Sequence, residues 1–132
     1  MKVTVDTNIL VRGAVRDDAR QTRAVDKILR EASSIAVSLP CLCEFVWVLR
    51  RVYHFDHMAI ATAIRTLLNT RNMMMNRPAV EAGLALLDAG GDFADGIMAY
   101  EGTWLGGETF VSFDKKAVTL LTRQGVATRL LT

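Results

Sequence analysis

The sequence lacks any uninterrupted apolar segment of about 18 residues, the length that a membrane-spanning helix requires. Its first residues, MKVTV, are strand-like and differ from the charged stretch and apolar core of a secretory leader. Internal repeats, linkers and low-complexity segments are also absent from its 132 residues. We therefore expect a cytosolic protein without a membrane anchor, formed by a single domain over residues 1–132.

Cysteine and net charge are both scarce. The two cysteines, Cys41 and Cys43, are two positions apart in an apolar run and are expected to be reduced. Their spacing to His54 and His57 fits no ordinary zinc pattern. The formal net charge is only +2, so charge allows a polyanionic partner without requiring one. Hydrophobic residues, in contrast, make up 51% of the chain, which is enough for a folded core.

Short apolar runs alternate with segments in which apolar residues recur at helical spacing. The expected strands are residues 2–5, 34–38, 72–76, 109–113 and 126–131. The expected helices are residues 17–32, 40–54, 56–70, 77–90, 93–105 and 114–125. Ser38, Asp56 and Asp92 stand where N-caps are expected. This alternation predicts an α/β fold with a parallel sheet.

Carboxylates fall where the strands end. Asp6 follows the first strand and Asp114 directly follows the fourth. Glu44 lies near the start of the helix after the second strand, and Asp95 lies in the first turn of its helix. The carboxyl ends of parallel strands meet at one edge, where ligands bind, so we expect these side chains to gather there. They would repel one another strongly, and a hard cation such as Mg²⁺ or Mn²⁺ would relieve that repulsion.

Each of these acids also has a simpler interpretation. Asp6 could be a turn residue, and Asp95 could only interact with the dipole of its helix. Asp114 could only cap the helix that it opens, as we expect of Asp92. Glu44 could be a solvated helix residue, although its apolar neighbours in sequence indicate an apolar setting.

Arginines recur at about one helical turn near the first predicted helix, at positions 12, 16, 20 and 23. A solvated face and a track for phosphates both explain this spacing, and the solvated face is the simpler explanation. Asp17 and Asp18 are also expected at the surface.

Four segments resemble the signature blocks of PIN-domain ribonucleases, in particular the VapC-type toxins of bacterial toxin–antitoxin pairs. These segments are VDTNIL, CEFVWVLRR, DFADGIMAYEG and TFVSFDKKA. Each block alone is weakly diagnostic, but together they are specific and cover essentially the whole chain. The resemblance implies a three-layer α/β fold, with helices flanking a central, mostly parallel sheet of about five short strands.

The resemblance also implies roles for particular residues. Asp6, Glu44, Asp95 and Asp114 match the acidic quartet that binds Mg²⁺ or Mn²⁺ and cleaves RNA. Thr7, Asn8 and Ser112 match polar residues that orient the carboxylates or the attacking water.

Two positions depart from the family pattern. Lys116 stands where many relatives have a further acid, which puts a complete second metal site in doubt. Gly96 stands where alanine or cysteine is more usual. Glycine costs roughly 1 kcal/mol in a helix interior and less near an end, so we expect only a local effect.

The sequence thus predicts a metal-dependent endoribonuclease, the toxin of a toxin–antitoxin pair, in which metal-activated water attacks a phosphodiester. The resemblance implies a small inhibitory antitoxin and a homodimer. Apolar side chains on the helices at 40–54 and 56–70 exceed what one face needs, namely Phe45, Trp47, Val48, Tyr53, Phe55 and Met58. One alternative is a non-catalytic module that binds RNA or a partner. A magnesium-dependent phosphatase with Asp6 as nucleophile is less favoured, because Asn8 breaks the D-x-D-x-T pattern of that class.

Overall fold

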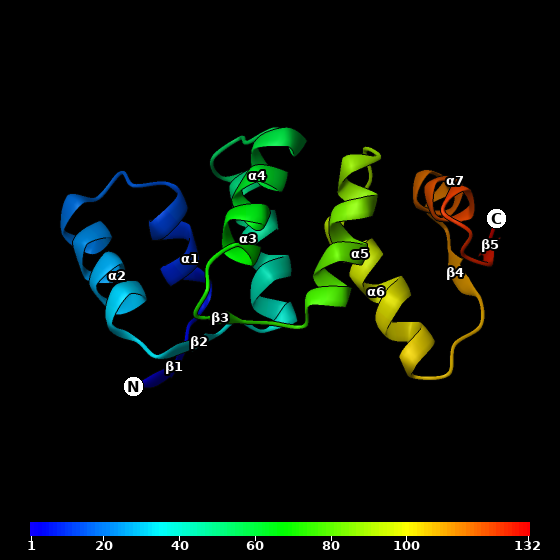
Figure 1. Cartoon of the computed structure of the whole chain (residues 1–132). Helices are drawn as coiled ribbons and strands as arrows, with labels where there is room; N and C mark the ends of the chain where they lie inside the picture. Colours follow the sequence, from blue (N-terminus) through cyan, green and yellow to red (C-terminus); the bar gives the residue numbers. More distant parts are fainter. The chain divides into compact units, whose positions relative to one another are not determined.

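The computed structural model describes residues 1–132 as two units, Met1–Asn76 and Arg77–Thr132, each with a sheet and helices of its own (Figure 1). The first unit contains β1 (Lys2–Thr4), α1 (Thr7–Ala14), α2 (Ala19–Glu31), β2 (Ser34–Ala36), α3 (Leu39–Arg51), α4 (His57–Leu68) and β3 (Met73–Met74). The second contains α5 (Arg77–Asp88), α6 (Phe93–Trp104), β4 (Phe110–Ser112), α7 (Lys115–Arg123) and β5 (Thr128–Leu130). None of the helices is both long enough and apolar enough to span a membrane.

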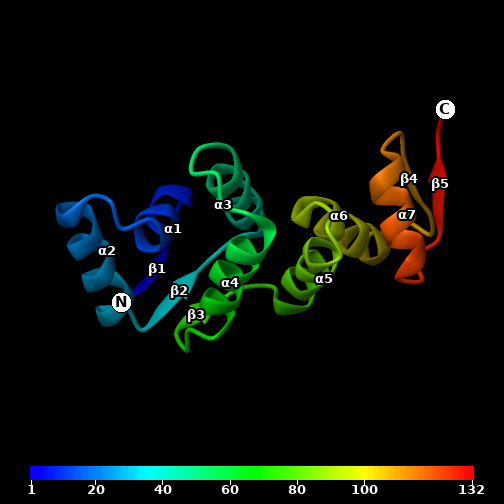
Figure 2. The same ribbon diagram turned by 90° about the horizontal axis from the view of Figure 1, so that it is seen from above.

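The sheet of the first unit has the order β1-β2-β3, and both strand pairs are parallel. Val3 pairs with Ile35, and Ile35 pairs with Met73. Helix α1 packs against α2 and α3, and α3 packs against α4 (Figures 1 and 2). The core of this unit consists of apolar side chains that are almost fully buried, among them Ile35, Leu42, Phe45, Leu49, Ile60 and Ile64.

Local signals in the sequence explain where these helices begin. The side chains of Asp6, Asp18, Ser38 and Asp56 each accept a hydrogen bond from the backbone N–H three residues further on. Such caps satisfy donors that the first helical turn leaves unpaired. The expected caps at Ser38 and Asp56 are therefore confirmed.

In the second unit, β4 and β5 form a parallel pair, and α7 packs alongside both strands (Figure 2). The buried side chains of Leu86, Leu120 and Leu121 join α5 to α7. Helices α5 and α6 pack closely, because glycines stand at their contact. A Cβ atom added at Gly96 would lie 2.6 Å from the carbonyl oxygen of Ala82 and 2.9 Å from the Cα of Gly83.

The sequence correctly predicts the α/β class, five short strands and six of the seven helices. Helix α1 is the one that the sequence pattern does not predict; its eight residues begin directly after Asp6. The five strands form two sheets, one in each unit, where one sheet was expected. The expectation for Gly96 was also wrong, since its lack of a side chain permits a backbone contact between two helices.

The apolar side chains expected at the surface of the helices at 40–54 and 56–70 differ in exposure. Phe45 is 1% exposed and belongs to the core, so it is not available to an interface, and its assignment was wrong. Met58, in contrast, is exposed at 69%. Ala24 of α2 and Met74 of β3 are exposed as well.

Candidate active site

Asp6 lies at the junction of β1 and α1. Its carboxylate caps α1 by accepting a hydrogen bond from the backbone N–H of Ile9 at 3.3 Å. Capping uses one carboxylate oxygen, Oδ1, and an ionised carboxylate has about four acceptor sites. The cap therefore leaves acceptor capacity on Asp6 for a cation.

Glu44 lies in α3, one helical turn beyond Cys41, and its side chain is exposed. The apolar setting expected for this residue is therefore wrong. Burial raises the pKa of the Cys41 thiol, and the negative charges of Asp6 and Glu44 raise it further. Both carboxylates thus act on the same thiol, which brings these two predicted site residues into one neighbourhood of the first unit.

Polar residues next to Asp6 have different surroundings. The Thr7 hydroxyl donates a hydrogen bond to the Cys41 sulfur at 3.9 Å, which ties the start of α1 to α3. Asn8 is exposed and lines a cleft that also contains Asp6. Neither Cys41 nor Cys43 forms a disulfide.

The second unit brings Asp95 and Asp114 together with Asp92. Burial raises the pKa of Asp95, and the negative charges of Asp92 and Asp114 raise it further. Asp92 caps α6 by accepting from the Ala94 N–H at 3.0 Å, as expected. Asp114 caps α7 by accepting from the Ala117 N–H at 3.1 Å. The ionised form of Asp95 is therefore repelled by two neighbouring negative charges, and a bound cation would offset that repulsion.

Ser112 lies at the end of β4 and supports the turn that carries Asp114. Its hydroxyl oxygen accepts a hydrogen bond from the Asp114 backbone N–H at 2.9 Å. The side chain thus fixes the backbone of an acidic residue, a role close to the orienting one that the sequence predicts.

The predicted quartet consequently appears as two pairs, Asp6 with Glu44 in the first unit and Asp95 with Asp114 in the second. In neither unit do three acidic, histidine or cysteine side chains form an arrangement that could hold a metal ion. The chemistry of the donors nevertheless fits a hard divalent cation, which prefers carboxylate oxygens.

The sequence matches the family model of the PIN domain over residues 3–117. This match extends across both units and includes all four acids of the predicted quartet. No curated protein matches the chain.

Proposed function

The chain belongs to the PIN domain family, and from this membership we propose that it is a metal-dependent endoribonuclease. The PIN domain is generally a nuclease fold that uses divalent metal ions. The observation that carries the proposal is the family match over residues 3–117, which contains each of the four acids in the expected order. We further propose that residues 1–132 act as one domain.

In this proposal Asp6, Glu44, Asp95 and Asp114 hold Mg²⁺ or Mn²⁺. When bound, such an ion polarises a phosphoryl oxygen and lowers the pKa of water, so that an in-line displacement becomes possible. The chain contributes the orientation of its carboxylates. The α1 cap sets the position of Asp6, and the Ser112 hydroxyl holds the turn before Asp114.

The test is cleavage of a single-stranded RNA by the purified chain. We expect cleavage in Mg²⁺ or Mn²⁺ and none in EDTA, with activity restored when the metal is added back. The same assay with a phosphatase substrate, and with beryllofluoride as an aspartyl-phosphate mimic, tests the phosphatase alternative. RNA binding without cleavage in any metal would instead favour the non-catalytic alternative.

We also propose that the nuclease is the toxin of a toxin–antitoxin pair, held inactive by a small antitoxin protein. Support comes from the resemblance to VapC-type toxins and from an apolar groove of about 380 Å³ in the first unit. One wall of the groove is α1, with Ile9, Leu10 and Gly13, and another is α4, with Ala59 and Ala63. Small side chains on both helices leave room for bulky apolar anchors of an antitoxin segment.

A homodimer is the assembly that we propose for the toxin. With Phe45 in the core, the exposed large apolar side chains in this region are Trp47 of α3, at 58% exposure, Met58 of α4, and Val52 just after α3. Two-fold dimers are the commonest assemblies, and an exposed tryptophan is a frequent interface anchor.

Co-expression with the neighbouring small reading frame tests the toxin role. We expect the product of that frame to co-purify with the chain, to suppress RNA cleavage and to relieve growth arrest in cells. Ala63→Trp should fill the groove and weaken the complex, whereas Ala85→Trp, at an exposed position of α5, should not. Light scattering of the complex should give two copies of the chain. If the chain alone is harmless to cells although it cleaves RNA, the toxin role fails and the nuclease remains.

A further inference from the structure

A second cleft, of about 470 Å³, opens beside Asp6 and shares Ile9 with the apolar groove. Its polar lining residues besides Asp6 are Asn8 and Arg12 of α1 and Gln21 of α2, and Ala24 and Val25 add an apolar wall. Asn8 and Arg12 are four residues apart, so they lie on the same face of α1. The cleft therefore joins a predicted metal-binding carboxylate to an amide and a guanidinium.

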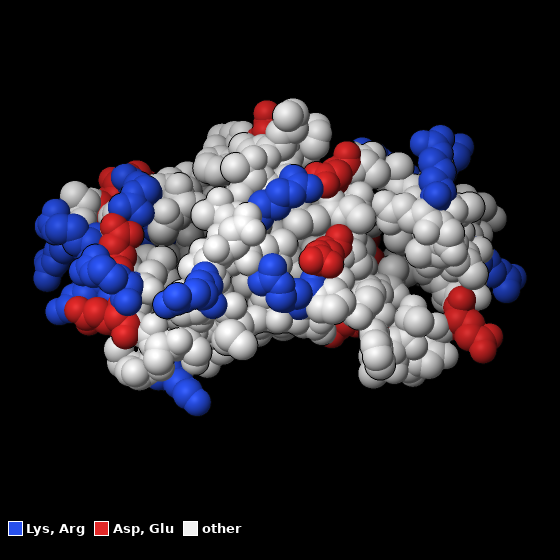
Figure 3. Space-filling model, in the orientation of Figure 1, with Lys and Arg blue, Asp and Glu red and all other residues white.

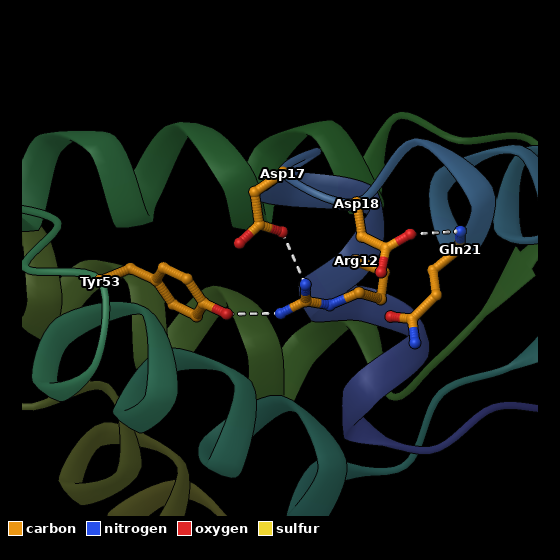
Figure 4. A network of polar contacts seen from close by, with 5 residues as sticks. All are labelled: Arg12, Asp17, Asp18, Gln21 and Tyr53. Atoms are coloured by element: carbon orange, nitrogen blue, oxygen red, sulfur yellow. Dashed lines mark hydrogen bonds and ion pairs between the residues drawn. The ribbon is translucent and has the colours of Figure 1, made fainter.

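Arg12 is held in a fixed position by two loops. Its Nη1 donates to Asp17 at 2.6 Å, and its Nη2 donates to the hydroxyl of Tyr53, which points at the guanidinium (Figure 4). The centroid of the Tyr53 ring is 5.9 Å from Cζ of Arg12. The side chain of Arg12 is only 19% exposed. Because these partners already fix the guanidinium, little conformational entropy remains to be lost when it binds a ligand.

The guanidinium keeps donors for a further partner. Arginine has five N–H groups, and the contacts with Asp17 and Tyr53 use one each. The guanidinium is always charged in proteins, and the hydrogen bond to Tyr53 raises the pKa of Arg12 further. Planar donors of this kind match the oxygens of a phosphate group.

The other arginines of this region do not combine a fixed guanidinium with a place in the cleft beside Asp6. Arg16 binds both carboxylate oxygens of Asp26, at 3.0 and 2.6 Å, and lines the apolar groove instead. Arg20 and Arg23 are exposed on α2, where basic and acidic side chains are mixed over the surface (Figure 3). The solvated face that the spacing favours therefore fits these arginines, whereas Arg12 alone lines the cleft beside Asp6.

We propose that Arg12, held by Asp17 and Tyr53, binds a backbone phosphate of RNA in the cleft beside Asp6. Asn8 and Gln21 lie close enough to this subsite to bind the adjoining nucleotide; the Gln21 side-chain amide points back toward α1 (Figure 4). This inference rests on the proposed nuclease function and adds a substrate-positioning residue outside the acidic quartet.

Binding of a labelled single-stranded RNA in EDTA tests the subsite without cleavage. Arg12→Gln should weaken binding about tenfold and reduce the slope of log K against log salt by about 0.7, the value for one phosphate contact on a single strand. The control is Arg23→Gln, the same change on the side of α2 away from the cleft residues, and it should leave the slope unchanged. In the cleavage assay, Arg12→Gln should raise KM more than it lowers kcat.

A second variant separates substrate binding from a purely structural role. Asp17→Asn removes the negative charge that competes with phosphate but keeps an amide oxygen that can accept the hydrogen bond from Arg12. The guanidinium should therefore stay in place and bind RNA more tightly. If Arg12 and Asp17 only stabilised the fold, both variants would lower the melting temperature and neither would strengthen binding. An unchanged salt slope in a folded Arg12→Gln variant overturns the subsite. Failure of the unmodified chain to bind or cleave RNA in any metal overturns the proposed function itself.

Discussion

Gly96→Ala should lower the free energy of unfolding by about 2 kcal/mol, although alanine is the better helix former. The added Cβ would lie 2.6 Å from the Ala82 carbonyl oxygen and 3.1 Å from the carbonyl carbon. These are backbone atoms, so no side-chain rotation can relieve the overlap, and α5 and α6 must move apart. Urea unfolding followed by circular dichroism measures the loss.

Gly102→Ala provides the matched control in the same helix. A Cβ added at Gly102 meets nothing within 4 Å. The substitution should therefore raise the free energy of unfolding by about 0.5–1 kcal/mol through helix propensity and a less flexible unfolded chain. Opposite signs at positions 96 and 102 are the expected result. Equal stabilisation at both positions would mean that the close contact between α5 and α6 does not exist in solution.

The expectation for Gly96 failed because the reason for a glycine can lie outside its own helix. Helix propensity is a local property, whereas the atoms that exclude a side chain at position 96 belong to Ala82 and Gly83 of α5. Nothing in the local pattern around Gly96 reports this contact. Gly83, in the middle of a well-patterned apolar helix, was the available signal, because a buried helical glycine often marks a close approach.

Other parts of the fold could be predicted because their causes are local. The caps at Ser38 and Asp56 depend on a side chain and an N–H three residues away, so sequence alone identifies them. Helix α1 is not predicted although its cap is visible in the sequence. Asp6 at the end of a strand is also typical of a metal ligand or a turn residue, and these interpretations compete with that of a cap for the Ile9 N–H.

In the candidate site, too, features with local causes could be predicted and features that depend on distant residues could not. That acids follow the strands could be predicted from the sequence. The capping role of Asp114 matches the simpler interpretation that the sequence leaves open, whereas Asp6 caps a helix although its simpler interpretation was a turn residue. The hydrogen bonds that hold Arg12 to Tyr53 and Asp17 could not be predicted, because Tyr53 is 41 residues away along the chain. A row of arginines in sequence does not distinguish a side chain held at a cleft from one paired elsewhere.

Asp95→Asn should lower the rate of RNA cleavage about 100-fold or more. The same substitution should stabilise the metal-free chain at neutral pH. The activity loss is expected because an amide is a weaker ligand than a carboxylate for a hard cation. The stability gain is expected because burial and the charges of Asp92 and Asp114 disfavour ionised Asp95 in the folded chain. Thermal unfolding in EDTA and an RNA cleavage assay in Mn²⁺ measure the two effects.

The pH dependence of that gain follows from the direction of the shift. The pKa of Asp95 is raised in the folded chain above its ordinary value of 3.8, so ionising this residue costs more free energy in the folded chain than in the unfolded one. As the pH falls through the pKa that Asp95 has in the folded chain, the folded chain takes up a proton before the unfolded chain does. The destabilisation caused by ionised Asp95 is therefore gone once the pH is below the ordinary pKa of 3.8. The advantage of Asp95→Asn should therefore be largest near pH 7 and shrink on acidification.

Added metal should make the unmodified chain more stable than Asp95→Asn, the reverse of the order expected in EDTA. A cation that binds only the folded chain stabilises it by mass action, and the unmodified chain should gain more from Mn²⁺ than Asp95→Asn does. Glu101→Gln, at an exposed position of the same helix, is the control and should change neither cleavage nor the response to metal. Cleavage by Asp95→Asn at the unmodified rate would remove Asp95 from the proposed site. A variant that is inactive but no more stable in EDTA would show instead that the neighbouring carboxylates do not strain the fold.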